Sequence, residues 1–145
     1  MKELFTEVEL RRLLQQEEGQ LLEFKSLWDL HPGKPPSPLS RRTVRQEISK
    51  QVAAFANADG GTLLLGVDDD GTPSGHGYPE AAVQDFLAMP ERHLRPPVPV
   101  EVQRMTLDGK EVIILQVPIH PEAVMVDGDG FPYRVADEVL MEKQE

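Results

Sequence analysis

The sequence of 145 residues contains no cysteine, which excludes both a disulfide framework and a zinc site built on thiolates. It also lacks any apolar run close to the roughly 20 residues that a membrane-spanning helix needs. Its first residues alternate acidic and apolar side chains, without the basic region and apolar stretch of a secretory signal. We therefore expect a cytoplasmic protein with no membrane partner.

Positive charge is scarce, with 15 Lys and Arg against 25 Asp and Glu and a net charge of −10. That balance opposes nucleic-acid binding, because phosphate contacts usually leave a basic footprint. The charge is uneven, however. Residues 25–50 carry six cationic and two acidic side chains, a local net charge of +4, whereas residues 51–91 contain no Lys or Arg. A basic segment beside an acidic one suits a protein that grips phosphate and holds a cation, although solvated surfaces often show the same pattern.

Hydrophobic periodicity predicts most of the secondary structure. Apolar residues at helical spacing indicate helices over residues 4–17, 41–57 and 79–89, and Ser40 is the best N-cap candidate for the second. Apolar runs or alternation indicate strands over residues 21–25, 62–67, 98–105, 111–118, 124–126 and 131–135. In the first strand, Leu22 and Phe24 share one face and Glu23 lies on the other.

The connections complete the expected topology. Prolines make residues 29–40 a surface loop, and Asp108-Gly109 is a strong hairpin turn between the strands over 98–105 and 111–118. The last two strands are expected to pair around residues 127–130. No linker interrupts the chain, so residues 1–145 are expected to form one domain. The predicted class is α+β (mixed α/β), with a mixed sheet of about five to six strands and about two to three helices.

Two segments carry a family resemblance: residues 18–25, with the sequence EGQLLEFK, and residues 53–71, with the sequence AAFANADGGTLLLGVDDDG. A weaker third segment is Tyr133-Arg134-Val135, in which an aromatic residue precedes an arginine. In this order they resemble the signature blocks of the Schlafen/AlbA-like domain family. The resemblance implies a nucleic-acid-binding α/β module, RNA or DNA, with a homodimer as a further expectation.

The resemblance also implies a catalytic site. In the ribonuclease members of the family, two glutamates five residues apart and an aspartate after the Gly-Val strand cleave RNA, which corresponds here to Glu18, Glu23 and Asp68. Clustered carboxylates of this kind hold Mg²⁺ or Mn²⁺, which can activate water for phosphodiester hydrolysis. Convergence of Glu18 with Glu23 requires a bend at Gly19. The alternative is structural, with Glu18 solvated and Asp68 part of a polar turn.

Several cations are candidates for binding nucleic acid: Lys25, Arg41, Arg42, Arg45, Lys50 and Arg134. Arg134 offers a fork of donors that suits either a phosphate or a carboxylate. Asn57 and Asp59 are secondary candidates, because the family places their segment beside its ligand groove. No Walker-type or dinucleotide-binding glycine motif is present, so the residues predict no ATP site.

The main hypothesis is thus a nucleic-acid-binding domain with a conditional metal-dependent endoribonuclease site. The alternative is a non-catalytic regulatory or oligomerisation module, similar to a transcription regulator, whose partner is a protein. Glu23 and Asp68 separate the two hypotheses, because only the first needs their carboxylates.

Overall fold

A computed structural model of the chain describes residues 5–142. Its helices are α1 (Glu7–Leu13), α2 (Arg41–Asn57), α3 (Glu80–Leu87) and α4 (Met89–Arg92). Its strands are β1 (Leu22–Lys25), β2 (Trp28–Asp29), β3 (Ser37–Pro38), β4 (Gly61–Leu65), β5 (Leu94–Arg95), β6 (Glu101–Leu107), β7 (Lys110–Val117), β8 (Met125–Val126), β9 (Phe131–Val135) and β10 (Glu138–Glu142). The predicted α+β class is confirmed.

The main sheet has four strands in the order β1-β4-β7-β6. Strand β1 runs parallel to β4, while β7 is antiparallel to both β4 and β6. The continuous apolar run of β4 suits this central place, because both faces of the strand are covered. The sheet is smaller than the expected five to six strands, since the other strands form the separate pairs β2–β3, β5–β8 and β9–β10.

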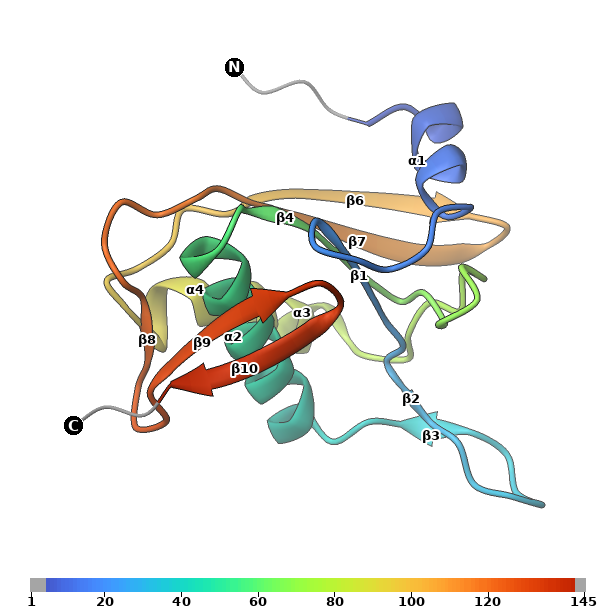
Figure 1. Cartoon of the computed structure of the whole chain (residues 1–145). Coiled ribbons are helices and arrows are strands. Elements are labelled where there is room, and N and C mark those ends of the chain that lie inside the picture. Colours follow the sequence, from blue (N-terminus) through green and yellow to red (C-terminus); the bar gives the residue numbers. More distant parts are fainter. Residues whose placement is uncertain (1–4, 143–145) are drawn as a thin grey trace.

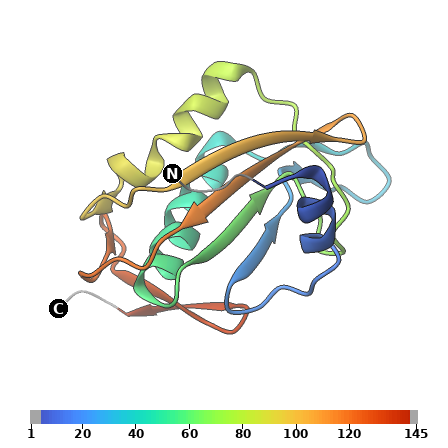
Figure 2. The same ribbon diagram turned by 90° about the horizontal axis from the view of Figure 1, so that it is seen from above.

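Two apolar cores lie on opposite faces of the main sheet, with α1 on one side and α2 on the other (Figure 1). Leu22 and Phe24 pack in the smaller core with Leu10 of α1. Glu23 lies on the opposite face of β1, as the alternation of this strand predicted. Viewed from above, α3 and α4 flank the sheet on the side away from α1 (Figure 2). None of the helices within residues 5–142 is long and apolar enough to cross a membrane.

Helix α2 contributes many of the buried side chains of the larger core. It begins at Arg41, where the sequence predicted. The Ser40 hydroxyl caps it by accepting a hydrogen bond from the backbone N–H of Thr43 at 3.1 Å. The β9–β10 hairpin lies across this helix (Figure 1). After the end of α2 the chain turns through Gly61. A Cβ atom added at Gly61 would lie 2.5 Å from the ring of Phe55. Glycine is therefore required by packing as well as by the turn.

Three details differ from the sequence predictions. The proline-rich segment 29–40 contains strand β3 and folds back so that β3 pairs with β2, forming a small hairpin that extends from the body (Figure 1). The predicted helix over residues 79–89 is α3, and the shorter helix α4 begins at Met89. The predicted pairing around residues 127–130 is limited to one antiparallel bridge between Val126 and Gly130, because β8 forms its ladder with β5 and β9 forms its ladder with β10. Residue 4, the predicted start of the first helix, lies outside the described residues.

Candidate functional site

The turn before β1 brings Glu18 close to Glu23. The N–H of Gly19 donates a hydrogen bond to the carbonyl oxygen of Leu22 at 3.0 Å, so the chain reverses between the two glutamates. The Glu18 carboxylate then accepts a hydrogen bond from the N–H of Phe24 at 2.8 Å. The bend that the pairing of these two acids requires is therefore present.

Arg134 forms a buried clasp beneath this pair. Its side chain is 0% exposed, and Nη2 lies 2.9 Å from Oε1 of Glu23. The guanidinium also lies over the ring of Phe55, 4.5 Å from its centroid. The other protein acceptors of the guanidinium are Gly19 O at 2.8 Å, Leu22 O at 3.0 Å and Gln51 Oε1 at 3.1 Å. Of the two partners that the sequence suggested for Arg134, a carboxylate or a phosphate, the structure shows a carboxylate, that of Glu23. The buried guanidinium has no donor directed to solvent that could bind a phosphate.

Glu23 has an unusual protonation equilibrium. Burial raises the pKa of Glu23 to about 7; Arg134 opposes this rise, while the hydrogen bond and the charge of Glu18 reinforce it. A carboxyl that gains and loses its proton near neutral pH can serve as a general acid or base. Glu23 is therefore the candidate for proton transfer within the Glu18–Glu23 pair.

Asp68 does not join this pair. It follows β4 in a tight turn, in which its N–H donates to Thr72 O at 2.9 Å and its carbonyl accepts from Gly71 N–H at 2.8 Å. Over residues 5–142, no group of three His, Asp or Glu side chains lies close enough to hold a metal ion. Within the described residues, Glu18, Glu23 and Asp68 therefore do not form a group that could hold one metal ion.

A different set of acids lies near Glu18. A cavity of about 680 Å³ is lined by Glu17 and Glu18 on one side and by Asp69 and Asp70 on the other. Arg11 also lines it and binds Asp108 at 3.0 Å. The neighbours of Glu18 from the acidic loop are thus Asp69 and Asp70 rather than Asp68.

The cations of α2 gather along a groove of about 610 Å³. Arg42, Arg45 and Lys50 line it together with His93 and with three acids, Glu47, Asp127 and Asp129. We call this surface the basic groove. Three of the four α2 cations predicted from the sequence therefore share one surface.

The remaining predicted cations lie around this groove or outside it. Lys25 of β1 lies 3.6 Å from Glu47, a groove residue that also binds Lys50 at 3.2 Å. Arg45 reaches Asp85 at 3.4 Å. Arg41 and Arg42 are exposed and form no ion pair with any other residue in the range 5–142. Arg42 is thus the groove cation with the fewest competing protein contacts.

Asn57 and Asp59 have structural partners. The Asn57 amide donates to Val124 O and Pro132 O, each at 2.7 Å, and its oxygen accepts from Val124 N–H at 2.6 Å. Asp59 accepts from the Gln20 side chain at 3.1 Å. Asn57 therefore joins the end of α2 to two later segments of the chain.

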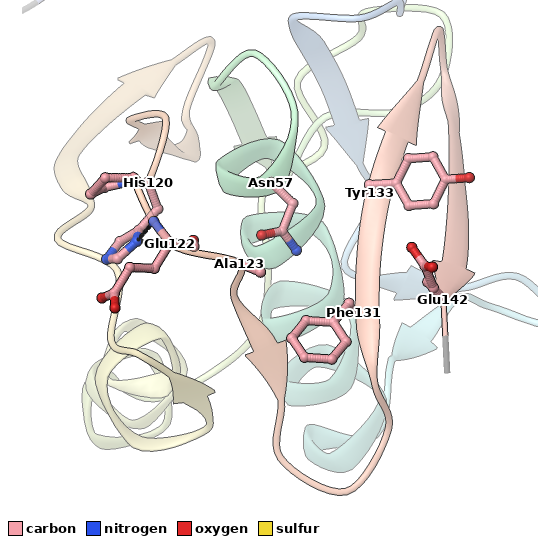
Figure 3. Close-up of a pocket in the computed structure, with 8 residues that line it drawn as sticks. Asn57, His120, Glu122, Ala123, Phe131, Tyr133 and Glu142 are labelled. Atoms are coloured by element: carbon pink, nitrogen blue, oxygen red, sulfur yellow. Dashed lines mark hydrogen bonds between the residues drawn. The ribbon is translucent and has the colours of Figure 1, made fainter. Parts of the chain in front are cut away.

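Asn57 also lines a cavity of about 520 Å³ between the 120–123 segment and the β9–β10 hairpin. Figure 3 shows Phe131 and Tyr133 projecting from β9, and Glu142 lies opposite Phe131 on β10. We call this space the hairpin cavity. Phe131 was not singled out from the sequence. The alternation of residues 131–135 carried the signal, because it places Phe131 and Tyr133 on the face opposite Pro132 and Arg134.

A second arginine cluster lies at the other edge of the sheet. Arg104 of β6 binds Glu80 at 2.6 Å and Glu111 at 2.8 Å, and Glu111 also lies 2.7 Å from Nε2 of His76. Hydrogen bonds from Arg104 lower the pKa of Glu80 to about 2. This cluster fixes the loop before α3 to the β6–β7 hairpin and explains the position of His76.

The fold and the clasp define an α+β module built around a buried Glu–Arg pair. A family model described as "Schlafen, AlbA_2" matches residues 18–140, so the chain belongs to this family. The resemblance recognised in the sequence is thereby confirmed. A comparison with curated protein sequences found no significant match.

Two solved structures share the fold. A crystal structure of the DIP2311 protein from Corynebacterium diphtheriae has a TM-score of 0.64 and 20% identity over 85% of this chain, which spans only 22% of that protein. A solution structure of the N-terminal domain of a RecG-related protein from Nitrosomonas europaea has a TM-score of 0.59 and 24% identity, with 94% of this chain and 88% of that domain covered. Both likenesses concern the fold.

Proposed function

We propose that this chain is a nucleic-acid-binding domain that holds a phosphate backbone along the basic groove. The observation that carries the proposal is that Arg42, Arg45 and Lys50 line one groove in a chain whose net charge is −10. Membership of the Schlafen AlbA_2 family supports it. The name of the N. europaea neighbour relates that protein to an ATP-dependent DNA helicase, which is consistent with the same theme.

The charges of the groove determine how such binding would behave. Glu47, Asp127 and Asp129 line the groove with the three cations, so a bound phosphate would be attracted by the cations and repelled by the same number of carboxylates. Binding supported by a few cations is weak at physiological salt and strengthens as the salt concentration falls. We therefore expect no base specificity from the groove itself, because phosphate contacts carry no sequence information.

The test compares two charge reversals of the same type. Arg42→Glu should weaken binding of a fluorescent single strand and of a duplex, measured by anisotropy over a range of salt concentrations. For each phosphate that the variant no longer neutralises, the slope of log affinity against log salt should fall by roughly 0.7 for the single strand and 0.9 for the duplex. Arg12→Glu changes the net charge equally but lies on α1, outside the groove, and should leave the slope unchanged. Equal effects of the two variants would refute the groove.

We further propose that the domain cleaves RNA. Glu23, with its pKa near neutral and Glu18 beside it, is the best candidate for a proton-transferring group. The arrangement of residues 5–142 does not fit a three-carboxylate metal site, so Mg²⁺ or Mn²⁺ together with Asp68 stays a prediction from the resemblance. Incubating structured RNA with the protein and Mn²⁺ tests it. Cleavage that persists in Glu23→Gln would exclude the glutamate pair.

The alternative, an oligomerisation module with a protein partner, has one observation in its favour. Leu140 on β10 is 40% exposed, and within the described residues β10 pairs only with β9. An unpaired strand edge beside an exposed apolar side chain is a common pairing surface. A homodimer at this edge predicts a mass of two chains by light scattering, and dissociation on Leu140→Arg.

A further inference from the structure

The hairpin cavity has two aromatic side chains in its lining. Phe131 and Tyr133 both line it, and Tyr133 is 37% exposed. The alternate residues of β9, Pro132 and Arg134, already supply the contacts that fasten the hairpin to α2. The two rings are thus available to a ligand as flat, apolar faces.

Hydrogen bonds of Asn57 connect the floor of the hairpin cavity to its walls. Asn57 uses its amide nitrogen and oxygen on Val124 and Pro132, which fixes the end of α2 to both walls. The N–H of His120 donates to the carbonyl oxygen of Ala56 at 3.0 Å, so the loop that forms the far wall is also held to the end of α2. A cavity held in this way does not need to reorganise when a ligand binds, which lowers the entropic cost of binding.

The charges around the hairpin cavity select the chemistry of its ligand. Glu122 and Glu142 line it, whereas the lining includes no Lys or Arg among the residues that the structure describes. Carboxylates repel a phosphate, but they accept hydrogen bonds from the amino and imino groups on the edge of a nucleobase. A planar base with N–H donors, stacked on an aromatic ring, matches both features.

The hairpin cavity also adjoins the basic groove. Met141 of β10 lines the groove and the next residue, Glu142, lines the cavity. Because successive side chains of a strand point to opposite faces, the groove and the cavity lie on opposite faces of the end of β10. A single strand has its phosphates and its bases on opposite sides of one backbone, so a strand that passes around the end of β10 can use both surfaces.

We propose that the hairpin cavity binds an unpaired nucleobase, with Tyr133 and Phe131 as the stacking surface, while the neighbouring phosphates lie in the basic groove. This inference rests on the proposed nucleic-acid function and gives that function a preference for single strands. In a duplex the bases are stacked on one another and their edges are paired, so a duplex can use only the groove.

The test uses the full chain and a fluorescent oligo(dC) of about 12 nucleotides, within the range of single-strand site sizes. Tyr133→Ala should weaken binding about 5- to 150-fold, the effect expected when one base is no longer stacked. Tyr133→Phe keeps the ring and should bind like the wild type. Val135→Ala is the matched control, because Val135 is also exposed on β9 but does not line the cavity. The affinity for a duplex should not change in any of these variants.

Two outcomes would overturn the inference, and they are distinguishable. If the wild type binds oligo(dC) but Tyr133→Ala weakens it no more than Val135→Ala does, the base site is wrong and the groove stands. If the wild type binds neither oligo(dC) nor the duplex at low salt, the proposed function fails and the base site fails with it. Thermal unfolding of each variant shows whether the hairpin is intact.

Discussion

Arg134 and Arg104 both bind glutamates, yet the acids beside them have opposite pKa shifts. The side chain of Arg134 is fully buried and that of its partner Glu23 is 14% exposed. The side chain of Arg104 is 28% exposed and that of its partner Glu80 is 61% exposed. The pKa of Glu23 rises to about 7 because of burial, whereas hydrogen bonds from Arg104 lower the pKa of Glu80 to about 2.

The difference shows that an arginine partner does not by itself keep a carboxyl ionised. Near Arg104 the carboxylate stays hydrated, so the ion pair is the largest influence. Near Arg134 the loss of water disfavours the charged form of Glu23, and the neighbouring acid Glu18 disfavours it further. The buried pair is thus the cluster with potential for proton transfer, while the exposed cluster is structural.

The largest effect is expected from Arg134→Met, which preserves the apolar contact but removes every donor. Glu23, Gln51 and two carbonyl groups would no longer have their partner, and breaking a buried ion pair costs about 3–5 kcal/mol. Urea unfolding monitored by circular dichroism measures the decrease in stability. The double variant Arg134→Met with Glu23→Gln should recover part of it, because the buried charge is gone. A decrease below about 1 kcal/mol in the single variant would show that the clasp is not a major support.

The next effect is a pH dependence that Glu23→Gln should remove. The pKa of Glu23 is about 7 in the folded protein against an ordinary value of 4.5, so the folded state holds this proton more tightly. The stability that Glu23 contributes is therefore complete below pH 4.5 and is lost as the pH rises through 7, by up to about 3 kcal/mol. The difference in unfolding free energy between wild type and variant should follow this course. A constant difference from pH 4 to 8 would contradict a raised pKa.

The sequence predicted most of the fold because its signals are local. The cap at Ser40, the stripe of α2, the apolar run of β4 and the turn at Asp108-Gly109 each depend on neighbours along the chain. The pairing of β9 with β10 was missed because strand partners are chosen by tertiary packing. The extent of the main sheet was overestimated for the same reason.

The candidate site was predicted less completely than the fold. The pairing of Glu18 with Glu23 followed from the resemblance, and Arg134 was singled out as a partner for a carboxylate or phosphate. Its burial could not be inferred, since it depends on Gln51 and Phe55 of α2 lying beneath β9. The position of the Asp68 side chain depends on the backbone hydrogen bonds of the turn after β4, and residue types alone do not determine these bonds.

The smallest effect is expected from Arg104→Met, which tests the exposed side of the comparison. Exposed ion pairs typically contribute less than about 1 kcal/mol and are screened by salt. The lowered pKa of Glu80 means that its contribution is present above pH 4.5 and is lost as the pH falls towards 2. Urea unfolding at two salt concentrations should therefore show a small deficit that shrinks in high salt and in acid. A deficit as large as that of Arg134→Met would mean that burial is not what distinguishes the two arginines.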